Sequence, residues 1–291
     1  MGLSLAVFSF LGAVFGSFVN ALVWRIYQQE QRTKSRKLKA QSNQNTKYQI
    51  PNTNLSILTG RSQCVHCGHP LSAKDLVPIF SWLTLAGRCR YCKKPISIGY
   101  PLVELAGALT FGASYYFWPG NLHSRGEWLL LITWLAVSVG LLALAVYDFL
   151  WFLLPNKIIY PTLAVAIAGR LIYIAGFEPH KLQAFWLWGW SVLAISGLFW
   201  LLFMVSSGRW IGYGDVRLGL ILGSVLAEPY KSLLVIFGAS LMGSLFALPS
   251  LLSGRTKLGS KLPYGPFLIM ATVLVMLFGQ SLINWYKQLL S

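Results

Sequence analysis

Eight stretches of apolar residues divide this chain. They cover approximately residues 3–24, 102–118, 128–147, 158–176, 185–205, 216–227, 232–252 and 264–284. An α-helix needs about 20 apolar residues to cross the hydrocarbon core of a bilayer. Only 11% of the 291 residues are charged, compared with about a quarter in a soluble domain. The sequence therefore predicts an all-α polytopic membrane protein with about eight transmembrane helices, of which the sixth is short.

The basic residues are concentrated in the loops on one side of these predicted helices. If the helices alternate, segments 25–101, 148–157, 206–217 and 253–263 share a side and contain 19 of the 24 Lys and Arg residues. Basic loops between spans stay in the cytoplasm, so this side is predicted to be cytoplasmic and both termini to lie outside. The net charge of +16 thus reflects membrane topology. We expect a lipid bilayer as partner and no nucleic acid, whose binding proteins carry a basic face on a soluble domain.

Composition separates four segments. Residues 1–24 form the first predicted transmembrane helix, which lacks the basic start of a signal peptide and is expected to be retained. Residues 25–59 are rich in Gln, Asn, Ser and Lys and form a cytoplasmic linker, predicted to be partly disordered. Residues 60–101 contain all four cysteines and form a small cytoplasmic module. Residues 102–291 form a seven-helix membrane domain.

The cysteines form two Cys-x2-Cys pairs, Cys64 with Cys67 and Cys89 with Cys92, separated by 21 residues. Four thiolates with this spacing can surround a zinc ion tetrahedrally, and disulfides rarely persist in the cytoplasm. We therefore predict a structural zinc site, which would also stabilise a module with little apolar core of its own. His66 and His69 are alternative ligands. Four reduced thiols without metal are the remaining alternative.

Only eight residues are acidic. When those of the predicted outer loops, the linker and the cysteine module are set aside, Glu104, Asp148 and Asp215 remain at cytoplasmic helix ends. Ionisable groups at a membrane are costly and indicate function. Two carboxylates in a partly dry site share a proton. One can then act as general base on a water while the other donates to a scissile carbonyl. Asp148 and Asp215 are the predicted catalytic pair of an aspartyl peptidase.

Two glycines flank the second of these aspartates, in Gly212-Tyr213-Gly214-Asp215. Because glycine lacks a side chain, Gly212 and Gly214 allow a substrate backbone to approach closely. Both are therefore predicted to lie near the substrate, and Glu104 is a third candidate for that position. The alternatives are that Asp215 only caps the following helix, and that Glu104 only pairs with nearby arginines.

Several motifs, in order along nearly the whole chain, give it a family resemblance. They are Gly16-Ser17-Phe18-Val19-Asn20, the double Cys-x2-Cys module continuing to Tyr100-Pro101-Leu102-Val103-Glu104, Asp148 with Leu154-Pro155-Asn156, Gly212-Tyr213-Gly214-Asp215-Val216-Arg217, and Pro263-Tyr264-Gly265-Pro266-Phe267. With these motifs the chain resembles the type IV prepilin peptidases, bacterial leader peptidases of the GxGD class of aspartyl proteases. Tyr27, Leu76 and Arg217 depart from residues common in that family.

The resemblance implies a multi-pass protein of the bacterial inner membrane that cleaves the leader from type IV prepilins or pseudopilins at the cytoplasmic face. It implies Asp148 and Asp215 as the catalytic pair. It also implies, for many members, methylation of the new N-terminal amine with S-adenosylmethionine as cofactor. The sequence carries no glycine-rich methyltransferase turn after a strand, so this second activity and its cofactor follow from the resemblance alone, and the residues that would bind the cofactor are not predicted.

Three alternatives stay open at this point. A GxGD protease of the presenilin or signal-peptide-peptidase kind would lack the double Cys-x2-Cys module. A transporter or assembly scaffold would carry its acidic residues near the bilayer midplane, whereas here they lie at one predicted face. Small residues at Gly12, Gly16, Gly107 and Gly112 permit close helix contact, either with the apolar helix of a substrate or between the enzyme's own helices.

Overall fold

A computed structural model describes residues 2–42, 62–253 and 262–290. Apart from two isolated β-bridges, the described residues form helices and turns without a strand. Two compact units are distinguished: unit 2 comprises Ser9–Leu109, and unit 1 comprises Met1–Phe8 together with Thr110–Ser291. The prediction of an all-α membrane protein is confirmed.

The first helix is longer than the sequence predicted. Helix α1 (Gly2–Ser42) continues well past residue 24, so the first part of the predicted linker is helical, and the rest of that linker lies outside the described residues. The polar continuation is rich in Gln, Lys and Arg. These residues have good helix propensity and extend an already nucleated helix at little cost.

Unit 2 also contains three further elements: η1 (Ala73–Leu76), α2 (Phe80–Thr84) and the first part of α3 (Gly99–Tyr116). Helices α1 and α3 touch through glycines. A Cβ added to Gly16 would lie 2.6 Å from the Cα of Glu104, and one added to Gly107 would collide with the carbonyl oxygen of Gly12. The Nδ2 group of Asn20 donates to the carbonyl oxygen of Tyr100 at 3.0 Å. For these three glycines, contact between the enzyme's own helices is therefore the correct alternative.

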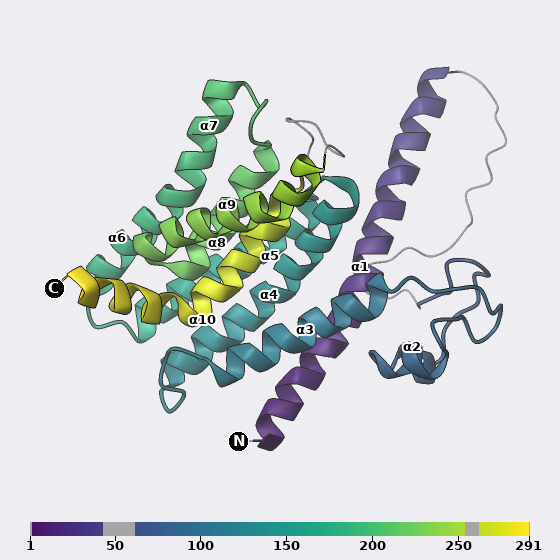
Figure 1. Ribbon diagram of the computed structural model, residues 1–291, viewed down its shortest axis with the longest axis horizontal. Coiled ribbons are helices and arrows are strands. Elements are labelled where there is room, and N and C mark those ends of the chain that lie inside the picture. The colour runs from purple at the N-terminus through teal and green to yellow at the C-terminus, as the bar shows by residue number, and fades with distance from the viewer. Residues whose placement is uncertain (1, 43–61, 254–261, 291) are drawn as a thin grey trace. The chain divides into compact units, whose positions relative to one another are not determined.

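Unit 1 contains the remaining helices: α4 (Arg125–Trp151), α5 (Asn156–Gly176), α6 (Lys181–Val192), the π-helical turn η2 (Leu193–Gly197), α7 (Leu198–Ser206), α8 (Tyr213–Leu226), α9 (Pro229–Leu252) and α10 (Gly265–Leu290). In Figure 1, α9 runs beside α10 and α4 beside α5. Helix α8 contacts α5, α6, η2, α7, α9 and α10. The shortest of the predicted stretches is thus the one surrounded by the others.

Each of the eight predicted stretches falls on a helix, with α6, η2 and α7 together forming the fifth. Among the described residues, six helices are long and apolar enough to cross a membrane: 2–35, 125–151, 156–176, 181–206, 229–249 and 265–289. Helices α3 and α8 are not among them, so the predicted count of eight is approximate. A helix enclosed by its neighbours does not need the length of a lipid-facing span.

Helix α8 is fixed by backbone contacts and hydroxyl groups. A Cβ added to Gly223 would lie 2.5 Å from the Cα of Val192. The Ser191 hydroxyl donates to the carbonyl oxygen of Gly223 at 2.9 Å, and the Ser196 hydroxyl donates to that of Val216, also at 2.9 Å. Small residues and interhelical hydrogen bonds hold membrane helices together, because lipid supplies no hydrophobic driving force between them.

Candidate functional site

Asp148 lies in the last turn of α4. Its side chain is buried, with the residue 7% exposed. Its Oδ2 accepts a hydrogen bond from the backbone N–H of Gly265 at 3.1 Å. A Cβ added to Gly265 would lie 2.6 Å from that same oxygen. Glycine at position 265 is therefore what lets the backbone at the start of α10 reach the carboxylate.

Asp215 lies in the first turn of α8, at its third residue. The residue that caps this helix is Gly212, in extended conformation with φ −75° and ψ 148°, and its carbonyl oxygen accepts the N–H of Asp215 at 3.0 Å. The reading of Asp215 as the helix cap is therefore wrong. A carboxylate in the first turn still interacts favourably with the helix dipole, so the position suits a negative charge.

The segments that carry the two aspartates contact each other, because Leu154 packs against Gly214 and Arg217 binds Asn156. The segment that precedes α10 reaches the first of these aspartates, because the N–H of Gly265 binds Oδ2 of Asp148. The hydroxyl of Tyr264 is 3.1 Å from that of Ser240 on α9. The structure thus brings together the segments of two predicted residues that are 67 positions apart, and it adds Gly265 with its neighbour Tyr264. Both residues belong to the motif Pro263-Tyr264-Gly265-Pro266-Phe267, but the sequence did not indicate what they contact.

The two predicted substrate-proximal glycines, Gly212 and Gly214, have different neighbours. Gly212 is exposed, and a Cβ there would lie 3.5 Å from Oδ2 of Asp215. A Cβ on Gly214 would lie 3.1 Å from the Cδ1 of Leu154. Gly214 therefore serves the close packing of α8 against the segment after α4, whereas Gly212 leaves space beside the carboxylate.

Arg217 links the residues that follow Asp215 to those that follow Asp148. Its guanidinium donates to the side-chain oxygen of Asn156, at the start of α5, and lies over the ring of Tyr213 at 4.4 Å from the centroid. Asn156 follows Asp148 by eight residues, and Arg217 follows Asp215 by two. The motif residues after each aspartate thus bind each other and hold the starts of α5 and α8 together.

The four cysteines form a compact cluster in unit 2. Their sulfur atoms all lie within 4.8 Å of one another, and the Sγ atoms of Cys64 and Cys92 are 3.8 Å apart. Four thiolates around zinc, each at about 2.3 Å in a tetrahedron, would have their sulfurs about 3.8 Å apart. Burial opposes ionisation of Cys64, but the backbone N–H groups of Cys67 and His66 outweigh it and lower the pKa of this thiol to about 7. The donor set fits a zinc ion.

The two cysteine pairs lie on equivalent turns. In the first, the N–H of Gly68 donates to the carbonyl oxygen of Cys64 at 2.9 Å, and Gly68 has φ +70°. In the second, the N–H of Lys93 donates to that of Cys89 at 3.0 Å, and Lys93 has φ +58°. An isolated β-bridge flanks each turn. His69 stacks edge-on against Tyr91 with ring centroids 3.8 Å apart, and neither His66 nor His69 belongs to the metal-binding cluster of the described residues.

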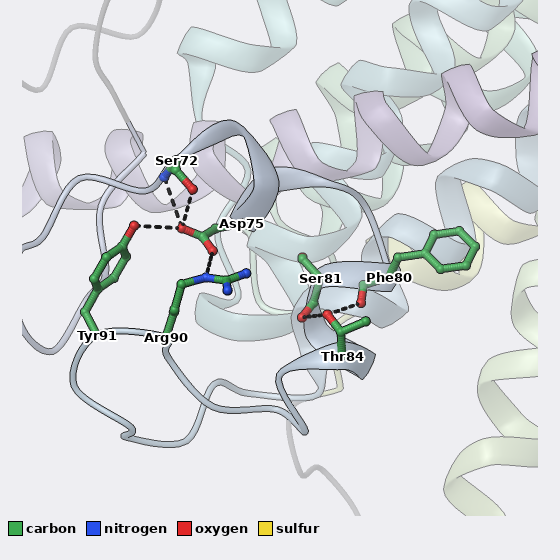
Figure 2. A network of polar contacts seen from close by, with 7 residues as sticks. All are labelled: Ser72, Asp75, Phe80, Ser81, Thr84, Arg90 and Tyr91. Carbon is green, nitrogen blue, oxygen red and sulfur yellow. Dashed lines mark hydrogen bonds and ion pairs between the residues drawn. The ribbon is translucent and has the colours of Figure 1, made fainter.

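Asp75 connects η1 to the second turn, as Figure 2 shows. Its carboxylate accepts from Nε of Arg90 at 2.7 Å, from the N–H and hydroxyl of Ser72 at 3.1 and 2.8 Å, and from the Tyr91 hydroxyl at 3.1 Å. Burial opposes ionisation of Asp75, but the hydrogen bonds from Arg90 and Ser72 outweigh it and lower the pKa of the carboxyl to about 2. Asp75 is therefore a charged structural residue of the cysteine module.

Glu104 lies in unit 2 near the start of α3 and is 8% exposed. Its Oε2 accepts the N–H of Ile79 at 2.7 Å, and Ile79 has the unusual φ of +64°. A second hydrogen bond comes from the Ser17 hydroxyl of α1. Glu104 thus joins three segments of unit 2. That it lies near a peptide substrate remains a prediction.

Two protein-family models match consecutive parts of the chain. Residues 10–118 match the model of the bacterial peptidase A24 N-terminal domain, and residues 135–248 match that of the type IV leader peptidase family. A prepilin leader peptidase/N-methyltransferase of Stutzerimonas stutzeri is 30% identical over 96% of this chain and 92% of its own length. Proteins of the same name from Pseudomonas aeruginosa and Aeromonas salmonicida are also 30% identical, over 96% and 94% of this chain and over 91% and 90% of their own lengths. No solved structure matches the chain.

Proposed function

The chain belongs to the type IV leader peptidase family, and we propose that it is a membrane aspartyl endopeptidase that removes the leader from type IV prepilins or pseudopilins. The observation that carries this proposal is the contact between the two aspartate segments, where Arg217 binds Asn156 and Leu154 packs against Gly214, in a chain aligned over most of its length with leader peptidases. We assign these two residues as the catalytic pair. Gly212 is the substrate-proximal position beside them.

The pair would hydrolyse a peptide bond with one shared proton. The ionised carboxylate takes a proton from a water, whose oxygen forms a bond to the scissile carbonyl carbon while the protonated carboxyl donates to the carbonyl oxygen. The C–N bond then breaks as the nitrogen takes the proton held by the first carboxyl, and the second carboxylate recovers its own proton from the former carbonyl oxygen. The N–H of Gly265 holds Asp148 in place by its hydrogen bond to Oδ2.

The proposed location is the bacterial inner membrane, with the aspartate pair and the cysteine module on the cytoplasmic side. The six candidate spans support a multi-pass protein, and the family is bacterial by the organisms of its named relatives. The side follows from the concentration of Lys and Arg in alternate loops. The proposed organisation is a first transmembrane helix, the linker 25–59, the zinc module 60–101 and the membrane peptidase domain 102–291.

The cysteine cluster is proposed as a structural zinc site. Cys64, Cys67, Cys89 and Cys92 would hold the ion, which would crosslink two turns that share little apolar core. A closed four-thiolate site has no open position for catalysis. Metal analysis of the purified protein should find one zinc per chain, and Cys89→Ser should lose it. Wild-type protein without zinc would refute this assignment.

A second activity, methylation of the new N-terminal amine, is proposed from the names of the relatives, which join leader peptidase and N-methyltransferase. Its cofactor would be S-adenosylmethionine, which supplies an activated methyl group on a sulfonium.

Cleavage of a purified prepilin by the protein in detergent or liposomes tests the peptidase proposal. Asp148→Asn and Asp215→Asn should each lower kcat/KM by about 10²–10⁴-fold or more, because each carboxyl has its own proton-transfer role. Glu178→Gln, at the other predicted face, is the matched control and should cleave normally. An aspartate variant that cleaves at the wild-type rate would exclude that residue from the pair. Wild-type protein that cleaves no prepilin would refute the activity.

A further inference from the structure

Helix α2 of the cysteine module carries apolar side chains on an exposed face. Phe80 is 66% exposed and Leu83 is 58% exposed, and Val77, which precedes the helix, is exposed as well. The N–H of Ser81 donates to the carbonyl oxygen of Val77 at 3.1 Å, so the helical turn already includes Val77. Residues three positions apart on a helix share a face. An exposed face of this kind marks a contact with another molecule or with a membrane.

The opposite face of α2 is held by Trp82. Its Nε1 group donates to the carbonyl oxygen of Ile96 at 3.2 Å. The ring also packs on Gly87, where an added Cβ would lie 2.8 Å from its Cζ2 atom. Because these contacts fix the rotation of the helix, α2 cannot turn its apolar face into the module. The side chain of Phe80 therefore needs an apolar environment outside it.

The backbone of α2 is satisfied without water. At its start the N–H of Ile79 donates to Oε2 of Glu104 at 2.7 Å. At its end the Thr84 hydroxyl donates to the carbonyl oxygens of Phe80 and Ser81 at 2.9 and 3.2 Å, as Figure 2 shows. In lipid every backbone polar group needs an internal partner. A short helix with these internal partners is suited to a position that contains little water.

Helix α2 begins beside the apolar stretch of α1. Ile79, the residue before α2, is bonded to Glu104, and a Cβ added to Gly16 would lie 2.6 Å from the Cα of Glu104. Gly16 precedes the end of the apolar stretch 3–24 by eight positions, which is about 12 Å along a helix. Helix α1 is a candidate membrane span. The exposed ring of Phe80 therefore leaves the module at the level of the apolar part of α1.

The exposed charges of the module are positive. Apart from the cysteines, the only acidic residue of segment 62–101 is Asp75, whose side chain is buried and paired with Arg90 at 2.7 Å. The other basic residues of this segment are exposed, namely Lys74, Arg88, Lys93 and Lys94. The anionic lipids of a cytoplasmic leaflet attract Lys and Arg near the membrane surface. An apolar face accompanied by Lys and Arg is typical of a segment that lies in the interface.

We propose that α2 inserts Phe80 and Leu83 into the cytoplasmic leaflet, at the boundary between headgroups and acyl chains, while the lysines and arginines of the module bind anionic phospholipid headgroups. The partner is the anionic lipid surface itself. The cysteine module is then a membrane-surface element between α1 and α3, and its orientation is set by lipid as well as by its contacts with these helices. The proposal concerns binding by unit 2 and does not depend on the peptidase activity.

Photo-crosslinking tests the insertion directly. The full-length protein, with Phe80 replaced by p-benzoylphenylalanine, is reconstituted into liposomes of phosphatidylcholine and phosphatidylglycerol and irradiated, and its adducts are identified by mass spectrometry. The matched control carries the same group in place of Tyr91, an exposed aromatic residue of the second cysteine turn that lies on the other side of Asp75 in Figure 2. Position 80 should yield at least about tenfold more lipid adduct than position 91, since an interfacial helix buries its apolar face about 5–10 Å deep.

The headgroup preference has its own test. Among the adducts at position 80, phosphatidylglycerol should be enriched at least about threefold over its share of the membrane, because the basic residues attract anionic lipid. The combined substitutions Lys74→Gln, Lys93→Gln and Lys94→Gln should return that share to the composition of the liposome. Lys181→Gln, an exposed lysine outside unit 2, should keep the enrichment. Zinc content, measured for each variant, shows whether the cysteine module is intact.

The other possible adducts would each overturn the proposal. Crosslinks from position 80 to residues of unit 1 would show that the chain itself covers this face. Crosslinks to an added prepilin, with loss of the lipid adducts, would assign the face to the substrate. Equal lipid adducts from positions 80 and 91, or adducts without enrichment of phosphatidylglycerol, would exclude specific contact with an anionic surface. Asp148→Asn should give the same lipid adducts as wild type, so a failure of the peptidase proposal would leave this one standing.

Discussion

Gly265 makes the contact whose loss should be most informative about the aspartate pair. Its N–H binds Oδ2 of Asp148 at 3.1 Å, and a Cβ at this position would lie 2.6 Å from that oxygen and 3.3 Å from Cγ. Favourable contacts between carbon and its neighbours begin near 3.5 Å. In Gly265→Ala, therefore, either the start of α10 or the Asp148 carboxylate must move by about 0.7–1 Å.

The size of the effect follows from that displacement. A catalytic group misplaced by about 1 Å costs on the order of 10²-fold in rate, which corresponds to about 2.7 kcal/mol of activation free energy. The variant should therefore cleave prepilin with kcat/KM about 10²-fold below wild type. Overpacking also lowers the free energy of unfolding by about 1–3 kcal/mol. Thermal unfolding of both proteins should therefore be measured, and activity compared at a temperature well below the unfolding midpoint of the variant.

A second glycine of the same unit provides the control. A Cβ on Gly238, in the middle of α9, would lie 3.7 Å from the Cβ of Ala271, an ordinary van der Waals contact. Gly238→Ala should retain wild-type kcat/KM. If Gly265→Ala cleaves within twofold of wild type, or if both variants lose activity equally, the contact with Asp148 does not position the carboxylate and the reasoning is wrong.

Three further predictions concern stability. Gly223→Val should lower the free energy of unfolding by about 1–3 kcal/mol through overpacking, and with it the midpoint of thermal unfolding, since a Cβ there would lie 2.5 Å from the α6 backbone. Gly189→Val, whose Cβ would meet nothing within 4 Å, is its control. Gly68→Ala should destabilise the cysteine module by about 1 kcal/mol through its positive φ, whereas Lys93→Gly should stabilise it by up to about 1 kcal/mol, both measured by chelator-induced unfolding. Asp75, with its pKa lowered to about 2, stabilises the module fully above about pH 4, and this contribution is lost as the pH falls through 2. The difference in unfolding midpoint between wild type and Asp75→Asn should therefore be present at neutral pH and vanish near pH 2; a difference independent of pH would contradict the charge argument.

The sequence was sufficient for those features that depend on local composition. Apolar stretches marked every helix of unit 1, because in lipid a helix must satisfy its backbone hydrogen bonds internally and present apolar side chains. The spacing of Cys64, Cys67, Cys89 and Cys92 predicted the cluster, since two Cys-x2-Cys turns can place four sulfurs around one metal ion. Asp148 and Asp215 were found by elimination, because so few acidic residues exist in the chain.

Contacts between distant segments could not be predicted from the sequence. The hydrogen bond from Gly265 to Asp148 joins residues 117 positions apart, and nothing in either local sequence specifies it. The likeness of the two cysteine turns was hidden as well, because Gly68 and Lys93 occupy the same left-handed position with different side chains. Unit 2 also contains a cavity of about 430 Å³ that is bounded by α1, the cysteine turns and the start of α3, so no single motif of the sequence indicates it.

The position of the aspartate pair depends on backbone packing more than on side-chain volume. Asp215 is placed by α8, whose register against α6 and η2 is set by Gly219 and Gly223 and by serine hydroxyls. Lipid tails compete equally well for apolar side chains, so close backbone contact is what distinguishes the correct helix arrangement. Small residues far from the carboxylates should then affect cleavage more than large exposed ones such as Phe237, which is 65% exposed. Phe237→Leu should preserve activity, whereas a bulky residue at position 223 should displace Asp215 although it lies two helical turns away.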